Sequence, residues 1–238
     1  YMLNKIPIAL FVADIHLSEK PPIARSSETD WFEAMKRQLK QLNNLVSKFN
    51  CPVICGGDVF DRWNSSANLI NFALDNLPKM YAIPGQHDLP LHSYEDIHKS
   101  AYWTLVKSGK IIDLKSGYPY QWSNITLYGF PFGFSVEPLM EDHIGLKIAV
   151  VHDYIWATED NSYGDAPIEK NILLSGYSKN LQGYDIAIFG DNHKWFKCKF
   201  DGGTYVYNCG GFLRRKADEV NYKPSIGLLY DDGNIVRH

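Results

Sequence analysis

The sequence predicts an α/β fold in layers, with at least one mixed β-sheet. Short apolar runs rich in Val, Ile and aromatic residues recur between helical stretches, and several lack polar alternation, as expected for strands covered on both faces. Strand and helix alternate in the first part of the chain, whereas the last part is richer in strands. The expected strands are Pro7–Ala13, Pro52–Cys55, Met80–Ile83, Ile125–Phe130, Leu146–Val151, Asp185–Phe189, Thr204–Tyr207 and Ile226–Tyr230.

Two helices are predicted from apolar spacing and from capping residues. Between the first two strands, apolar residues recur at steps of three and four, which is typical of an amphipathic helix. A second helix is expected over Tyr94–Lys107, with Ser93 as its N-cap and Gly109 just past its end. The first stripe consists of Phe32, Met35, Leu39, Leu42, Val46 and Phe49.

No repeat or linker divides the chain, so residues 1–238 are expected to form a single domain. The polar stretch from Glu159 to Lys170 is interpreted as a loop near the functional site rather than as a domain boundary. No apolar run approaches 18 residues and no signal-peptide pattern opens the chain, so a cytoplasmic protein without membrane contact is expected.

Charge and cysteine content narrow the functional classes. The formal net charge of −3 argues against a generic polyanion binder, so any nucleic-acid contact must come from a local basic patch or from metal ions. The cysteines lack the CxxC spacing of zinc and redox motifs, and we interpret them as reduced core residues. They are Cys51, Cys55, Cys198 and Cys209.

Polar side chains follow the first two predicted strands at the point where each strand ends. Asp14 and His16 are two residues apart, so in an extended segment they share one face and could bind one cation. Asp58 follows Gly56 and Gly57, which allow a tight turn and a close approach to a ligand. Taken alone, either pattern also fits an ordinary turn.

The later strand ends repeat this arrangement. The third strand runs into Gln86, His87 and Asp88, where the carboxylate could orient the imidazole or keep it protonated. Open α/β sheets bind their ligands at the carboxyl ends of strands, so polar residues at successive ends predict a metal site. Two further strands run into His152 and into Asp191 and His193.

The order of these segments resembles the calcineurin-like metallophosphoesterases, over residues 8 to 215. The resemblance implies an α/β fold of two packed, mostly mixed β-sheets flanked by helices, which agrees with the strand-rich pattern. The motifs that carry it are Asp14-x-His16, Gly57-Asp58-x-x-Asp61, Gly85-Gln86-His87-Asp88, His152 and Gly190-Asp191-x-His193.

The resemblance also implies a role for each motif residue. Two divalent cations would activate a water molecule that attacks phosphorus. His87 matches the catalytic histidine, which contacts the phosphate and protonates the leaving oxygen, and Asp88 stands beside it. The first cation would be held by Asp14, His16 and His193, both cations by Asp58, and the second by His152 with Gln86 and Asp191.

Two positions depart from the family pattern, and both fall on the second cation. Gln86 stands in place of the usual Asn, and Asp191 in place of a His. A site richer in oxygen should favour Mn²⁺ or Mg²⁺ over Zn²⁺. We expect Mn²⁺, with Mg²⁺, Zn²⁺ and Fe²⁺ as alternatives; a second site that binds weakly, or only with substrate, remains open.

Within the superfamily, the chain most resembles the short, phage-like versions of SbcD-type exonuclease subunits of DNA repair. The resemblance implies hydrolysis of phosphodiester bonds in DNA and an ATPase subunit as partner. The chain ends soon after the motif region, so the long C-terminal capping and ATPase-binding parts are not expected. The segments that carry the resemblance are 14–17, 56–61 and 208–215.

Substrate contacts are expected from Arg214, Arg215 and His92. A basic stretch could follow a phosphate backbone, although a solvated face is the alternative. Two functional alternatives also stay open: a phosphomonoesterase or small-nucleotide phosphodiesterase acting on nucleotides, and a non-catalytic, metal-bound scaffold. The basic stretch comprises Lys194, Lys197, Lys199, Arg214, Arg215, Lys216 and Lys223, opposed by Asp201, Asp218 and Glu219.

Overall fold

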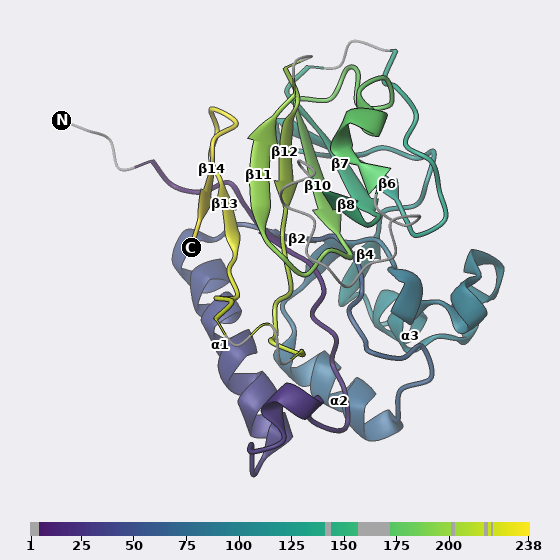
Figure 1. The fold of residues 1–238 in the computed structure, drawn as a ribbon, viewed down its shortest axis with the longest axis vertical. Helices are drawn as coiled ribbons and strands as arrows, with labels where there is room; N and C mark the ends of the chain where they lie inside the picture. Colours follow the sequence, from purple (N-terminus) through teal and green to yellow (C-terminus); the bar gives the residue numbers. More distant parts are fainter. Residues whose placement is uncertain (1–4, 141–143, 157–171, 201–202, 217–218, 220) are drawn as a thin grey trace.

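Two six-stranded sheets lie at the centre of the molecule, and helices flank them (Figure 1). The computed structural model describes residues 5–140, 144–156, 172–200, 203–216, 219 and 221–238. The fold class expected from the sequence is confirmed. The loop predicted over Glu159–Lys170 lies outside the described residues.

The first sheet has the strand order β14-β13-β1-β2-β3-β4. Strands β1 to β4 run parallel, whereas β13 pairs antiparallel with β1 and β14 pairs antiparallel with β13. The bounds are β1 Ala9–Val12, β2 Val53–Cys55, β3 Met80–Ala82, β4 Ile111–Asp113, β13 Gly227–Leu229 and β14 Ile235–Arg237.

The second sheet has the strand order β11-β12-β10-β7-β6-β5. Its four central strands are parallel, and the edge strands β11 and β5 are antiparallel to their neighbours. A short parallel pair, β8 Ile155–Trp156 with β9 Ile172–Leu173, forms a separate two-stranded sheet. The bounds are β5 Tyr120–Trp122, β6 Ile125–Phe130, β7 Leu146–His152, β10 Ile186–Gly190, β11 Phe196–Lys199 and β12 Tyr205–Asn208.

Three α-helices, α1 Trp31–Phe49, α2 Ala67–Asn76 and α3 Ala101–Lys107, cover one face of the first sheet (Figure 1). Helix α1 begins where the Asp30 carboxylate accepts a hydrogen bond from the Glu33 amide, and it ends at Asn50 in a left-handed conformation. No helix among the described residues combines the length and the apolarity needed to cross a membrane. Within the described residues, the 3-10 turns are Ile23–Arg25, Gln86–Asp88, Pro90–His92, Tyr94–Lys99 and Leu174–Tyr177.

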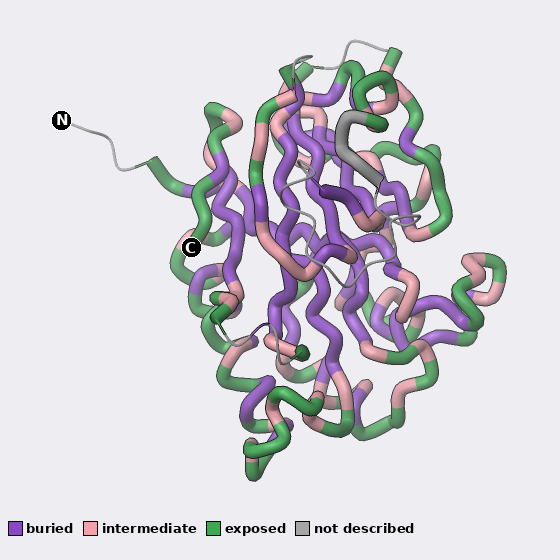
Figure 2. The backbone as a smooth tube through the Cα atoms, viewed as in Figure 1, coloured by how far each residue is buried: buried purple, intermediate pink, exposed green. Residues whose placement is uncertain are grey.

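The central strands of both sheets are buried (Figure 2), and their side chains belong to three hydrophobic clusters. In β1, Leu10 and Val12 pack with the helices, whereas Phe11 lies in the cluster between the sheets. In β10, Ile188 faces that same cluster and Phe189 packs on the outer side of the second sheet. Burying a side chain of this size stabilises the fold by roughly 1.5–3 kcal/mol, so the three clusters hold the helices and the two sheets together.

All eight predicted strands are present, with ends shifted by a residue or two, and the long helix is confirmed. The prediction of one helix over Tyr94–Lys107 is wrong. Residues Tyr94–Lys99 form 3-10 turns, and a new helix begins at Ala101 because the Ser100 hydroxyl caps it by accepting from the Trp103 amide at 3.1 Å. Ser93 makes no side-chain capping bond.

Candidate active site

The carboxyl ends of strands from both sheets meet and are joined by hydrogen bonds. The Asp14 amide donates to Gly57 O at 2.9 Å, and the Asp191 amide donates to Asp14 Oδ1 at 3.0 Å. His152 Nδ1 lies 2.7 Å from Gly56 O. These contacts fix the ends of β1, β2, β7 and β10 relative to one another.

Several polar residues at these ends adopt a backbone conformation that side chains other than glycine rarely take. The φ angle is +53° at Asp14, +49° at His16, +54° at Asp58 and +87° at Asp191. Left-handed backbone at such residues costs on the order of 1–3 kcal/mol and concentrates at functional sites. The fold therefore maintains strain at four of the positions that the sequence marks as metal ligands.

Glycine is required near Asp58 and His152 because the backbone passes so close to their side chains. A Cβ atom at Gly85 would lie 2.1 Å from Asp58 Oδ1, and one at Gly57 would lie 2.4 Å from His152 Nδ1. The glycines of the two sequence motifs thus leave room for the carboxylate and the imidazole.

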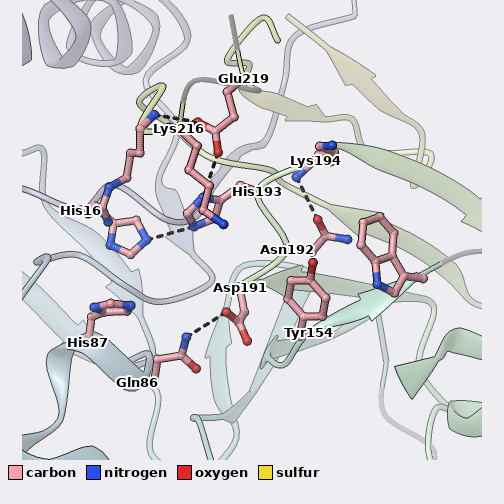
Figure 3. Close-up of a pocket in the computed structure, with 12 residues that line it drawn as sticks. His16, Gln86, His87, Tyr154, Asp191, Asn192, His193, Lys194, Lys216 and Glu219 are labelled. Atoms are coloured by element: carbon pink, nitrogen blue, oxygen red, sulfur yellow. Dashed lines mark hydrogen bonds and ion pairs between the residues drawn. The ribbon is translucent and has the colours of Figure 1, made fainter. Parts of the chain in front are cut away.

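The imidazoles of His16 and His193 point toward each other on one side of the site (Figure 3), and the Asp14 carboxylate lies near both. The Nε2 atoms of His16 and His193 are 3.2 Å apart, and Asp14 Oδ1 lies 3.9 Å and 4.0 Å from them, respectively. The other ring nitrogen of His193 lies 3.3 Å from Glu219 Oε1. A donor bond from Nδ1 to that carboxylate leaves the Nε2 lone pair directed into the site, as in many metal-binding histidines.

Asp58 lies between this cluster and a second imidazole. Its Oδ2 atom is 3.6 Å from His16 Nε2 and 3.5 Å from His152 Nε2, while its Oδ1 accepts a hydrogen bond from the His87 amide at 2.9 Å. Both Asp58 Oδ2 and His152 Nε2 are buried without a hydrogen-bond partner. Unpaired buried polar atoms are costly, and a cation between them would remove that cost.

The donor set fits divalent cations on these grounds. Within the described residues, three groups bring their ligand atoms within 4.8 Å of one another. Mixed imidazole and carboxylate ligands suit Zn²⁺, Fe²⁺ and Mn²⁺. The groups are Asp14, His16 and His193; His16, Asp58 and His87; and Asp14, Asp58 and His152.

Burial and the charges of neighbouring groups shift the pKa values of the acids and histidines in the cluster. Burial raises the pKa of Asp14 to about 7, and it also raises that of Asp191. Burial lowers the pKa of His16 well below its usual value. For His152, burial acts in the same direction, but the charge of Asp58 outweighs it and the pKa is raised. Several acids in one buried site therefore compete for protons, and a bound cation would stabilise their charged forms.

The two residues that depart from the expected pattern contact each other. Gln86 Nε2 donates to Asp191 Oδ1 at 3.0 Å, and both residues line the same pocket (Figure 3). The bond uses the amide nitrogen, so the amide oxygen of Gln86 takes no part in it.

The interpretation that Asp88 orients His87 is not supported by the geometry. Both carboxylate oxygens of Asp88 accept from backbone amides, those of Val59, Phe60 and Gly85, at 2.9–3.1 Å. His87 Nδ1 instead lies 2.9 Å from the carbonyl oxygen of Asp61. Asp88 thus ties the second and third strand-end loops together, and Asp61 orients the imidazole.

The basic segment reaches the site through Arg215 but not through all of the predicted residues. Arg215 forms an ion pair with Asp61 and lines the pocket. Arg214 is not among the described residues that line it. His92 is exposed, and its Nδ1 atom lies 3.1 Å from the carbonyl oxygen of Gln86. The centroid of its ring is 6.2 Å from that of the Phe132 ring.

Glu219 is a site residue that the sequence did not reveal. Its carboxylate lies beside His193, and its Oε2 atom also accepts from the Arg215 and Lys216 amides. Burial opposes its ionisation, but these partners outweigh it and lower its pKa. Glu219 follows no strand and belongs to no motif, so only the folded loop could place it.

The pocket has a volume of about 330 Å³ and combines the acid–imidazole cluster with cations. Lys194, Arg215 and Lys216 supply positive charge at its wall. Its full lining is His16, Gln86, His87, Tyr154, Trp156, Asp191, Asn192, His193, Lys194, Arg215, Lys216 and Glu219.

Sequence comparison identifies the class of enzyme to which this fold and site belong. The profile of the calcineurin-like phosphoesterases matches residues 9–195, and the chain belongs to that family. Members of the family use divalent metal ions, and the acid–imidazole groups above are this chain's candidates to hold them.

Solved structures share the fold at low sequence identity. The calcineurin-like phosphoesterase YfkN of Bacillus subtilis aligns with a TM-score of 0.52 and 12% identity, over 98% of this chain and 88% of that one. A dimetal phosphatase of Danio rerio aligns with a TM-score of 0.52 and 11% identity, over 94% of each chain. A search of curated proteins finds no significant match.

Proposed function

We propose that this chain hydrolyses phosphodiester bonds of nucleic acid with two divalent cations, Mn²⁺ being the expected metal. The observation that carries the proposal is the position of Asp58 Oδ2, buried and unpaired between the Nε2 atoms of His16 and His152. A carboxylate oxygen in that place suits a ligand shared by two cations.

The candidate ligands divide into two sets around Asp58. The first set would be Asp14, His16 and His193, and the second would be His152 with Gln86 and Asp191. When bound, the cations would supply a hydroxide at neutral pH and neutralise charge on the phosphoryl oxygens. The oxygen-rich second set supports Mn²⁺ over Zn²⁺.

The remaining side chains position the substrate and handle the leaving group. His87 lies beside His16, with ring centroids 4.9 Å apart, and its Nδ1 is held by Asp61 O. That contact leaves Nε2 to donate a proton to the leaving oxygen when the ring is protonated. Arg215 and Lys216, which also line the pocket, would hold non-bridging phosphate oxygens.

A nucleic-acid substrate is supported by charge that extends past the cluster. Lys194 lines the pocket on the side of Asn192, away from His87 (Figure 3). A monoester would need cations only around its single phosphate, whereas a strand presents further phosphates to such side chains. The closer assignment to a DNA-repair nuclease of the SbcD type, a cytoplasmic location and an ATPase partner are proposals that rest on the sequence alone.

An activity panel with Mn²⁺ tests the proposal. We expect hydrolysis of linear DNA and of bis-p-nitrophenyl phosphate, and little hydrolysis of p-nitrophenyl phosphate. Cleavage of the monoester alone would support the nucleotide phosphomonoesterase. If no substrate turned over while two metal ions still bound, the non-catalytic scaffold would be the better description.

A further inference from the structure

A second cavity, of about 290 Å³, adjoins the active-site pocket and shares Trp156 and Lys194 with it. The second cavity is rich in aromatic rings and cations, whereas the acids and imidazoles of the candidate metal cluster line only the first. We call it the aromatic groove; it is lined by Trp156, Lys194, Trp195, Phe196, Asn221, Tyr222, Lys223 and Arg237.

The groove lies where an edge of each sheet approaches the other. Trp195 and Phe196 stand at the start of β11, the edge of the second sheet, and Arg237 ends β14, the edge of the first. Lys197 Nζ reaches Ile235 O at 3.4 Å, which confirms that the two edges are adjacent. The groove walls are thus set by strands rather than by a loop alone.

Arg237 forms a fixed planar surface in this groove. Its guanidinium lies 4.5 Å from the centre of the Trp195 ring and 5.9 Å from that of Tyr222. Its Nε donates to Ser225 Oγ at 2.9 Å, and a terminal nitrogen donates to Lys223 O. Because these bonds hold the side chain, little rotamer freedom remains to be lost when a ligand binds.

Tyr222 is seated against the glycine turn that follows β12. A Cβ atom at Gly210, where φ is +71°, would lie 2.0 Å from the Tyr222 hydroxyl oxygen. The same turn leads into Arg215, which lines the active-site pocket. Residues close together in the chain thus line both cavities, with Arg215 in the pocket and Tyr222 in the groove.

The charge of the groove indicates the kind of ligand. Lys194, Lys223 and Arg237 line it, and no acidic side chain does so among the described residues. Aromatic rings and arginine planes stack on nucleobases, while the cations attract the phosphates between them. Phosphate alone would need no aromatic walls.

We propose that the aromatic groove binds the nucleobases of an unpaired nucleic-acid strand that continues from the phosphate held in the active-site pocket. This inference rests on the proposed function, since it names the part of the substrate that lies beyond the scissile bond. The shared residues Trp156 and Lys194 mark where the strand would pass from one cavity to the other.

Binding without turnover tests the groove separately from the chemistry. With the full chain in EDTA, fluorescence anisotropy would compare labelled hexathymidylate with an abasic hexamer carrying the same phosphates. We expect hexathymidylate to bind about tenfold more tightly, because stacking contributes per base. Equal affinities would show that the bases are not engaged and would overturn the proposal.

Variants place the interaction in the groove. Arg237→Met should weaken hexathymidylate binding about tenfold by removing the plane and the charge. Lys223→Ala should weaken it less and lower the slope of log affinity against log salt by about one. Lys48→Ala is the matched control, because Lys48 also lies over an aromatic ring, Phe49 at 5.0 Å, but on α1. Wild-type affinity in a folded Arg237→Met variant and in Lys223→Ala would contradict the proposal.

Turnover measurements then distinguish failure of the groove proposal from failure of the proposed function. Arg237→Met should lower kcat/KM for the oligonucleotide at least about fivefold more than for bis-p-nitrophenyl phosphate, which has no strand continuing beyond its single phosphate. An enzyme that cleaved neither substrate would refute the proposed function, whereas the anisotropy result would still decide the groove. If thymidine monophosphate displaced the labelled strand as effectively as hexathymidylate does, the groove would be a site for free nucleotides. That result would overturn the proposal that it binds a nucleic-acid strand.

Discussion

Gln86 donates its amide hydrogen to Asp191 at 3.0 Å, so the two residues that depart from the family pattern are hydrogen-bonded partners. The longer Gln side chain reaches a carboxylate where the family pattern has a histidine. The charged acceptor strengthens such a bond. This bond leaves the amide oxygen of Gln86 and the second oxygen of Asp191 outside it, and under the proposed function both oxygens would bind the second cation.

The first prediction concerns this pair. Gln86→Asn and Asp191→His should each lower the affinity of the second metal site by about tenfold to a hundredfold, because each change leaves the other residue without its hydrogen-bond partner. The double variant should recover affinity and bind Zn²⁺ in preference to Mn²⁺. Metal titration calorimetry with both ions measures this, with the exposed Gln41→Asn on α1 as the control. Additive losses in the double variant would show that the pair is not coupled.

A second prediction follows from the central position of Asp58. Asp58→Asn should lower the affinity of both metal ions, since its Oδ2 atom lies within 3.6 Å of His16 Nε2 and of His152 Nε2. His16→Ala should mainly lower the affinity for the first metal ion. Metal content after dialysis against Mn²⁺ gives the stoichiometry of each variant, and full double occupancy of Asp58→Asn would rule out a bridging role.

The third prediction separates His87 from Asp88. His87→Ala should abolish turnover and leave metal content nearly unchanged, because the residue is assigned to the leaving group. Asp88→Ala should lower the free energy of unfolding by about 3 kcal/mol or more, because it leaves three buried amides unsatisfied. Urea unfolding and metal analysis of both variants distinguish the two roles. Loss of metal from His87→Ala would make it a ligand instead.

A fourth prediction uses the pH dependence of stability at Asp113. Burial raises the pKa of this carboxyl, although Tyr102 donates to it at 2.8 Å. An acid with a raised folded-state pKa destabilises the fold increasingly as pH rises through its titration. Tyr102→Phe removes the donor, so its cost should be about 1–3 kcal/mol at pH 7 and smaller near pH 4.

Tyr94→Phe provides the matched control for that experiment. Its hydroxyl lies 3.5 Å from Asp113, a much weaker contact, so its effect should be smaller at both pH values. Urea unfolding at the two pH values measures each difference. A Tyr102→Phe penalty that did not grow with pH would contradict the assignment.

The sequence predicted the central strands because buried strands are apolar along their length, as in Ile148–Val151, but it did not predict β4, β5, β8, β9, β11 and β14, which are short or lie at sheet edges. It did not predict α2, which buries only Leu69 and Ala73 and so shows little periodicity. The single helix expected over Tyr94–Lys107 failed because Ser100 caps a new helix within the span. Propensity and spacing do not reveal where a local side-chain bond will divide a helical stretch.

Candidate ligands at strand ends were visible in the sequence, because the topology of open sheets brings such ends together. Contacts made by loops were not. The backbone carbonyl of Asp61 contacts the His87 imidazole. The Glu219 carboxylate lies beside His193, although Glu219 belongs to no sequence motif. The orientation of these groups depends on tertiary packing, which periodicity does not encode.

The most direct test of the two-metal site is a crystal structure of the protein grown with Mn²⁺, with anomalous scattering recorded for manganese. Two anomalous peaks should flank Asp58 Oδ2, one beside His16 and His193 and the other beside His152. One peak alone, or peaks that do not contact Asp58, would contradict the account.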